Sequence, residues 1–197
     1  ALALVFEFNN KGELIVARQG IGHWQRQFDG EDAAEEVLNI IPELVSLTDG
    51  GVGNTVNVGI ARAVNPRAPP KNSKMLGRFR VAVTGNAGHA GARSLEGQGD
   101  TLLEIARKNQ RLNEFLKETY GGHVHVITRY LHSGQKRNQI PPESKWIIEI
   151  YRDNGYPLDK LEEDVLGILR KPLVTGITSC QVRELAVGER FLGSLNN

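Results

Sequence analysis

The stretch TLLEIARKNQRLNEFLKETYGGHVHVITRYL, residues 101–131, joins a helix-like pattern to a strand-like pattern across two glycines. Apolar side chains in its first part recur at helical spacing and form one stripe: Leu102, Ile105, Ala106, Leu112, Phe115 and Leu116. Thr101 and Glu104 match the pattern of a capping box, so a helix is predicted over residues 101–120, ending at the glycine pair. HVHVITRYL, residues 123–131, is rich in strand-forming residues and predicts a strand.

Strand-like and helix-like segments lie on both sides of this stretch. Strands are predicted over GRFRVAVT (77–84) and KWIIEIYR (145–152), because apolar and polar residues alternate in both. A second helix is predicted to begin at Pro157, and LVTGIT followed by QVRELAV predicts a last strand or a bulged pair. From about residue 76 the predicted order is therefore β-α-β-β-α-β, the split βαβ arrangement of ferredoxin-like folds.

The N-terminal part combines strands and a helix in a similar way. LALVFEF and ELIVAR flank the turn NNKG and predict a hairpin, and residues 29–47 carry apolar residues at helical spacing. TVNVGIARAV, residues 55–64, predicts a third strand. The resulting ββα-ββα-ββα-β order predicts an α+β fold, a mostly antiparallel sheet with three helices on one face. We expect a single domain over residues 1–197, with a subdivision into an N-terminal hairpin-helix-strand part, 1–64, and the ferredoxin-like part, 76–187.

Composition and charge limit the function classes open to this chain. Of its 197 residues, 40% are hydrophobic and 24% are charged, and 24 Lys and Arg residues are balanced by 23 Asp and Glu residues. No overall basic field therefore attracts nucleic acid. Cys180 is the single cysteine, which excludes an internal disulfide and a multi-cysteine zinc site. The apolar runs are too short to span a membrane and ALALVF lacks the basic start of a signal peptide, so we expect a cytoplasmic protein, or one within a larger assembly, without a membrane partner.

One face of the predicted sheet gathers polar side chains. If the polar faces of the three central strands coincide, that face carries five of them: Arg80, His125, Arg129, Glu149 and Tyr151. Guanidinium groups supply charge, imidazole supplies hydrogen bonds and tyrosine supplies a stacking surface, so the set predicts a site that grips phosphate. A solvated face, or a face buried against another subunit, is the structural alternative.

The run His123-Val124-His125 on such a sheet resembles the HUH single-strand endonucleases. The resemblance implies a divalent metal held by His123 and His125, with Tyr156 or Tyr151 as the nucleophile. The metal would polarise a phosphoryl oxygen, and tyrosinate or water would attack. The sequence fixes no third metal ligand, so a site without metal stays open.

A glycine-rich segment, GNAGHAGARSLEGQG, follows the strand at 77–84. With the preceding threonine it resembles the cofactor loop of short-chain dehydrogenases, in which glycines let the backbone approach a pyrophosphate. The next helix is predicted to begin only at residue 101 and the flanking strands look antiparallel, so we do not expect a dinucleotide site. We expect instead a flexible loop that contacts an anion or a neighbouring molecule through His89, Arg93 and Ser94.

Two long loops, NPRAPPKNSK and HSGQKRNQ, carry further positive charge. Lys136 and Arg137 in the second loop would extend the positive face toward nucleic acid or another polyanion. Solvated loops are the structural alternative.

Two functional interpretations follow from these patterns. In the first, the chain is a non-enzymatic structural module without a cofactor that forms homo-oligomers. Its open sheet face and its long Pro- and Gly-rich loops would contact other subunits or an anionic partner. In the second, the chain is a metal-assisted phosphoester hydrolase or nuclease that uses the His-Val-His strand and a divalent metal.

Overall fold

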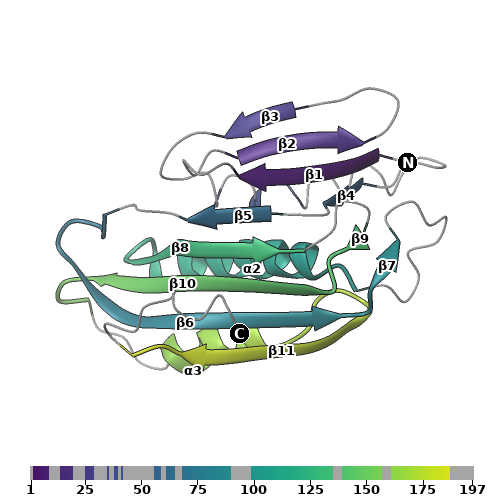
Figure 1. Ribbon diagram of the computed structural model, residues 1–197. Coiled ribbons are helices and arrows are strands. Elements are labelled where there is room, and N and C mark those ends of the chain that lie inside the picture. Colours follow the sequence, from purple (N-terminus) through teal and green to yellow (C-terminus); the bar gives the residue numbers. More distant parts are fainter. Residues whose placement is uncertain are drawn as a thin grey trace.

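The computed structural model describes most of the C-terminal two thirds of the chain and shorter parts of the N-terminal third (Figure 1). The described residues are 2–8, 14–19, 25–28, 35, 38–39, 41, 56–58, 61–64, 68–89, 99–134, 139–156 and 161–186. No helix among these residues is long and apolar enough to cross a membrane.

Five strands form the larger sheet, in the order β11-β6-β10-β8-β5, and all neighbouring strands in it are antiparallel. The strands are β5 Ala61–Val64, β6 Ser73–Gly85, β8 Val124–Ser133, β10 Glu143–Asp153 and β11 Ile177–Glu184. Two helices, α2 Thr101–Tyr120 and α3 Leu161–Arg170, lie behind this sheet in Figure 1, with α2 against β6, β8 and β10 and α3 beside β11. The predicted α+β class and antiparallel sheet are therefore confirmed.

Four strands near the N-terminus form a second sheet, in the order β3-β2-β1-β4. They are β1 Leu2–Phe8, β2 Leu14–Gln19, β3 Gln25–Phe28 and β4 Val56–Val58. The first two strands pair antiparallel from Phe8 and Leu14 outward, as expected of the predicted hairpin, whereas β4 runs parallel to β1. A separate two-stranded sheet joins β7 Gly88–His89 to β9 Gln139–Ile140. The sequence patterns did not predict β3, β7 or β9.

The prediction of one strand over residues 55–64 is wrong, and the predicted ββα-ββα-ββα-β order fails with it. This segment contributes β4 to the smaller sheet and β5 to the larger sheet, where β5 pairs with β8. The alternation of apolar and polar residues predicts a strand but not its partner. The choice of partner depends on β1 and β8, which lie far away in the sequence.

The predicted first helix falls mostly outside the described residues. Glu35, Leu38, Asn39 and Ile41 have helical backbone. Leu38 and Ile41 are buried in the same apolar cluster as the residues of α2, and the Asn109 side-chain amide donates to Asn39 Oδ1 at 3.3 Å. A layer of three helices on one face of the sheet therefore stays a prediction.

The bounds of α2 agree with the predicted helix, but its first turn is capped by a different residue. Asp100 is the N-cap, and its Oδ1 accepts hydrogen bonds from the backbone N–H groups of Leu102 and Leu103, both at 3.0 Å. The predicted capping box is wrong, because the carboxylate of Glu104 accepts from the distant N–H groups of Leu173 and Val174 instead. Gly121, with a φ of 59°, ends the helix in the left-handed conformation that favours glycine.

The core lies between the helices and the near face of the larger sheet. β6 and β10 each contribute three alternate side chains to it, as their alternation predicted: Phe79, Val81, Val83, Trp146, Ile148 and Ile150. β8 follows the same rule until the register shifts, where Thr128 pairs with Ile148 and Tyr130 pairs with Ile147. Arg129 is the extra residue between them, so the side chains that follow it exchange faces of the sheet, and Leu131 enters the core.

Candidate functional site

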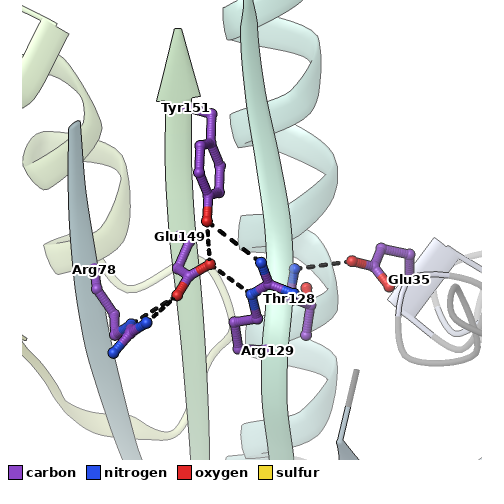
Figure 2. A network of polar contacts seen from close by, with 6 residues as sticks. All are labelled: Glu35, Arg78, Thr128, Arg129, Glu149 and Tyr151. Atoms are coloured by element: carbon purple, nitrogen blue, oxygen red, sulfur yellow. Dashed lines mark hydrogen bonds and ion pairs between the residues drawn. The ribbon is translucent and has the colours of Figure 1, made fainter. Parts of the chain in front are cut away.

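Side chains from three strands meet in one polar network on the sheet face away from the helices (Figure 2). The carboxylate of Glu149 on β10 lies at its centre, and Oε2 accepts from Arg129 Nε at 2.5 Å and from the Tyr151 hydroxyl at 2.6 Å. The other oxygen, Oε1, accepts from Arg78 Nε on β6 at 2.8 Å. Arg129 also donates to the Tyr151 hydroxyl oxygen at 3.3 Å, so one carboxylate ties together β6, β8 and β10.

Glu35, the sixth residue drawn in Figure 2, reaches the neighbouring backbone of β8. Its Oε1 accepts a hydrogen bond from the Thr128 N–H at 2.8 Å. The contact lies just before Arg129, where the register of β8 shifts against β10. A side chain far away in the sequence therefore satisfies a donor at an irregular point of the strand.

This network is buried, and its pKa shifts follow from that. Glu149 is only 2% exposed and Tyr151 only 5% exposed. Burial by itself would raise the pKa of Glu149, but hydrogen bonds from Tyr151, Arg129 and Arg78 outweigh it and hold this pKa below its usual value. Burial and the bond to Glu149 raise the pKa of Tyr151. The Tyr151 hydroxyl therefore stays protonated at neutral pH, which disfavours it as a nucleophile.

The structure brings together three residues of the predicted phosphate-gripping set, Arg129, Glu149 and Tyr151, but they contact one another. Arg80 is half-buried and opposite Ile147 in the register, and His125 lies opposite Tyr151. The expectation of an open face is corrected at its centre, because Tyr130, Ile147 and Leu185 form a buried apolar cluster there. Binding of an anion by the predicted set stays a prediction.

A second polar cluster lies at one end of this face, where β8 begins and β10 ends. Asp153 Oδ2 is 3.0 Å from His123 Nδ1, and Asp153 Oδ1 is 3.0 Å from His125 Nε2. These side chains reach solvent: 51% of the His123 side chain, 37% of the His125 side chain and 38% of the Asp153 side chain are exposed. One carboxylate therefore holds both histidines of the His-Val-His run.

A tight turn after β10 places an aromatic ring over the first histidine. The Tyr156 N–H donates to the Asp153 carbonyl oxygen at 3.2 Å, and Gly155 within the turn has a φ of 81°. The ring of Tyr156 then stacks on the imidazole of His123, with 4.4 Å between centroids and 22° between planes. The stack and the carboxylate together fix the orientation of the His123 ring.

The chemistry of this cluster depends on which atoms carry protons. Hydrogen bonds from His125 and His123 lower the pKa of Asp153, so the carboxylate is ionised at neutral pH and each ring nitrogen facing it donates an N–H. When the rings are neutral, the outward nitrogens, Nε2 of His123 and Nδ1 of His125, carry lone pairs that can accept a proton. Within the described ranges, no group of three or more His, Cys, Asp or Glu side chains is arranged to share a metal ion.

The remaining predicted site residues belong to the glycine-rich segment and to one of the basic loops. Arg93, Ser94, Lys136 and Arg137 lie outside the described residues. The backbone of His89 belongs to β7 and pairs with Gln139. Binding of an anion or a neighbouring molecule by these residues stays a prediction.

Sequence reasoning missed two residues of these clusters, Asp153 and Arg78. A signal for Asp153 was present, because it directly precedes the Asn-Gly pair that closes β10. In an antiparallel pairing of β10 with β8, that position lies opposite the start of β8 and thus opposite His123. Alternation places Arg78 and Arg80 on the same face of β6. It does not show which of the two lies opposite Glu149, because that depends on the register between β6 and β10.

Comparisons with known proteins give only partial likeness. No protein-family model matches the chain, and no curated protein matches it. A solved structure from Burkholderia cenocepacia, described as an amidohydrolase/peptidase, has a TM-score of 0.48 and 19% identity over 58% of this chain and 28% of its own. An amidase of the hydantoinase/carbamoylase family from Burkholderia multivorans has a TM-score of 0.44 and 15% identity over 65% of this chain and 28% of its own. A second such amidase, from Burkholderia vietnamiensis, has a TM-score of 0.40 and 17% identity over 49% of this chain and 23% of its own.

These comparisons correct one interpretation of the sequence. The similar structures are described as enzymes, in contrast to the interpretation of the sequence as a non-enzymatic structural module, and that interpretation is not kept. The chain spans about a quarter of the length of those structures.

Proposed function

We propose that this chain acts in a hydrolytic enzyme and that His123 and His125 are its acid–base groups. The observation that supports the proposal is the Asp153 carboxylate, which lies 3.0 Å from one nitrogen of each imidazole. A carboxylate in this position determines which ring nitrogen carries the proton and leaves the other nitrogen to accept one. It also stabilises the imidazolium that forms when a ring takes up a proton.

In the proposed reaction, the outward nitrogen of one imidazole takes a proton from water as the water oxygen attacks the substrate. The bond to the leaving group then breaks, and a protonated imidazole gives a proton to that group. Both rings are exposed enough to meet a substrate from solvent. Tyr156, stacked on His123, holds that ring in place and needs no chemical role of its own.

A divalent metal at the two histidines, which the resemblance of the His-Val-His run to the HUH endonucleases implies, is the alternative form of this proposal. Imidazole nitrogens are common ligands of zinc and other transition metals. Such a metal would activate water or polarise the substrate. In metal sites, a carboxylate that accepts a hydrogen bond from the other ring nitrogen orients the metal-binding histidine. Asp153 would have this role for His123 and His125.

The test measures hydrolysis by the chain with a panel of substrates. The panel includes an amide, a carbamoyl compound and a hydantoin, chosen from the words amidase and hydantoinase/carbamoylase in the descriptions of the similar structures, together with a phosphodiester. Each substrate is tested with EDTA and with Zn²⁺ or Mn²⁺. We expect His123→Ala and His125→Ala each to lower kcat/KM by about 10²- to 10⁴-fold, the range typical of a lost acid–base group.

A matched control separates this role from general damage. Asp153→Asn is expected to lower activity and to change the pH profile, whereas Asp164→Asn, an exposed aspartate on α3, should leave both unchanged. Circular dichroism and the melting temperature check that each variant folds. Activity that survives both histidine substitutions would reject the proposal, as would a folded chain that hydrolyses none of the substrates with or without metal.

We also propose that the part from β6 to β11 is a ferredoxin-like unit. The β-α-β-β-α-β succession and the sheet order β11-β6-β10-β8 support this.

Division of the chain at about residues 64–76, homo-oligomer formation and binding of nucleic acid or another polyanion are kept as proposals. Light scattering with and without added nucleic acid tests the last two. A cytoplasmic location is proposed on the presence of a single cysteine, Cys180.

A further inference from the structure

A groove of about 810 Å³ lies between α3 and the sheet, and no residue of the two polar clusters lines it. Its floor is apolar: Phe79 on β6, Ile150 on β10 and Val165 on α3 line it, and they are 4%, 2% and 1% exposed. Figure 1 shows α3 behind β11 and β6, so this groove is on the helix side of the sheet. Its volume is within the range of small-molecule sites, about 300–1,000 Å³.

The edge of the groove exposes apolar surface that the described part of the chain does not cover. Leu76, on β6, is a large hydrophobic residue, yet 37% of it is exposed. Leu166, on α3, also lines the groove and is half-buried. An aliphatic chain lying between these two side chains would remove both from water.

The charged residues at the groove are mostly acidic. Glu162, Glu163 and Glu184 line it, against one guanidinium, that of Arg170. The first two also lie in the first turn of α3, where negative charge is favoured by the helix dipole. Glu184 lies at the end of the strand β11, where no helix dipole favours negative charge. Two separate elements therefore bring carboxylates to the same groove. The balance of charge suits a ligand that carries a positive charge.

Gly167 on α3 lines this groove without a side chain. It lies in the interior of α3, where glycine weakens a helix by roughly 0.5–1 kcal/mol relative to alanine. A Cβ atom built at Gly167 would have nothing within 4 Å, so close packing within the described fold does not require glycine there. Gly167 is among the residues that line the groove, so a larger side chain there would take up part of its space.

We infer that this groove binds a small aliphatic compound that ends in a protonated amino group. The aliphatic part would lie on Phe79, Ile150 and Val165, and the ammonium group would lie among the carboxylates. The inference uses none of the residues of the His123 and His125 cluster and does not depend on the proposed hydrolytic function.

Binding of two probes of equal chain length tests the inference, because decylammonium and decanoate differ in the sign of the head group. Isothermal titration calorimetry below the micelle concentration measures both dissociation constants at pH 7. We expect decylammonium to bind at least about five-fold more tightly than decanoate, since each exposed carboxylate is worth about a 1.5- to 5-fold change in affinity. Equal binding of the two probes would overturn the assignment of charge.

Two variants locate the site. Gly167→Leu should weaken decylammonium binding by about ten-fold or more, although leucine is the better helix former and the melting temperature should not fall. The triple variant Glu162→Gln, Glu163→Gln, Glu184→Gln should remove the preference for decylammonium over decanoate. Glu118→Leu and Glu118→Gln, at an exposed position on α2, are the matched controls and should bind like the parent chain. Unchanged binding in Gly167→Leu, or no binding of decylammonium to the parent chain, would overturn the inference.

Discussion

Lys108 Nζ lies 2.8 Å from Glu104 Oε1 on α2, and neither side chain is exposed to solvent. Glu104 also accepts hydrogen bonds from the N–H groups of Leu173 and Val174, at 2.9 Å and 2.7 Å. Lys108 donates to the Ile168 carbonyl oxygen at 3.3 Å and to that of Lys171. The pair therefore satisfies backbone groups at the end of α3 and in the segment that leads to β11.

Removing one charge of this pair should strongly destabilise the fold. Lys108→Met leaves the Glu104 carboxylate buried without its cation, which typically costs about 3–5 kcal/mol. Urea unfolding followed by circular dichroism measures the loss. Lys117→Met, an exposed position on the same helix, should change the free energy of unfolding by less than about 0.5 kcal/mol. A loss in the free energy of unfolding for Lys108→Met as small as that for Lys117→Met would contradict a stabilising role of the buried pair.

The Glu149 network should behave in the same way. Glu149→Gln keeps the size of the side chain but removes the charge that two guanidinium groups share, so we expect a loss of about 3 kcal/mol or more. Chemical denaturation at pH 7 measures it. Glu143→Gln, on the same strand with half of its side chain exposed, is the control and should be nearly neutral. A small effect at both positions would contradict the role of Glu149.

Asp100 should make stability depend on pH. Burial raises the pKa of Asp100 from 3.8 to about 6, although the N–H groups of Leu103 and Leu102 act against this. Because the folded pKa is above the unfolded one, the folded state binds more protons between these values. The contribution is therefore fully present below about pH 4 and is lost as the pH rises through about 6.

Asp100→Asn tests this linkage, since asparagine is an equally good N-cap and does not titrate. The variant should gain stability relative to the parent chain as the pH rises from 4 to 7. The gain should reach at most about 3 kcal/mol, and the partial exposure of Asp100 makes this an upper bound. Urea unfolding at a series of pH values measures the difference. A difference that stays constant over this range would contradict the raised pKa.

Gly167→Ala should stabilise α3. Nothing stands within 4 Å of an added Cβ, and alanine should gain roughly 0.5–1 kcal/mol over glycine in a helix interior. Differential scanning calorimetry should show a higher melting temperature. Gly122→Ala also meets open space, but Gly122 has a φ of 89°, so that variant should be destabilised. A fall in stability of Gly167→Ala would indicate a close contact at α3.

Local patterns were reliable where the determining contacts are near in the sequence. The apolar stripe and the glycine pair predicted the bounds of α2, because helical spacing and the left-handed conformation of Gly121 act within a few residues. Alternation likewise predicted which side chains of β6 and β10 enter the core. It failed to show that residues 55–64 divide between two sheets, since the partners β1 and β8 lie far away.

The sequence by itself therefore determined the helices, the strands and the turns that carry the candidate sites, including the placement of His123 and His125 on one strand. Only the tertiary structure decided that Asp153 holds both histidines, that Glu149 lies buried between two arginines and that Glu104 and Lys108 are in the core. The physical reason is that backbone preferences act over a few neighbouring residues. The loss of water around a charge, in contrast, depends on segments that meet only when the chain has folded.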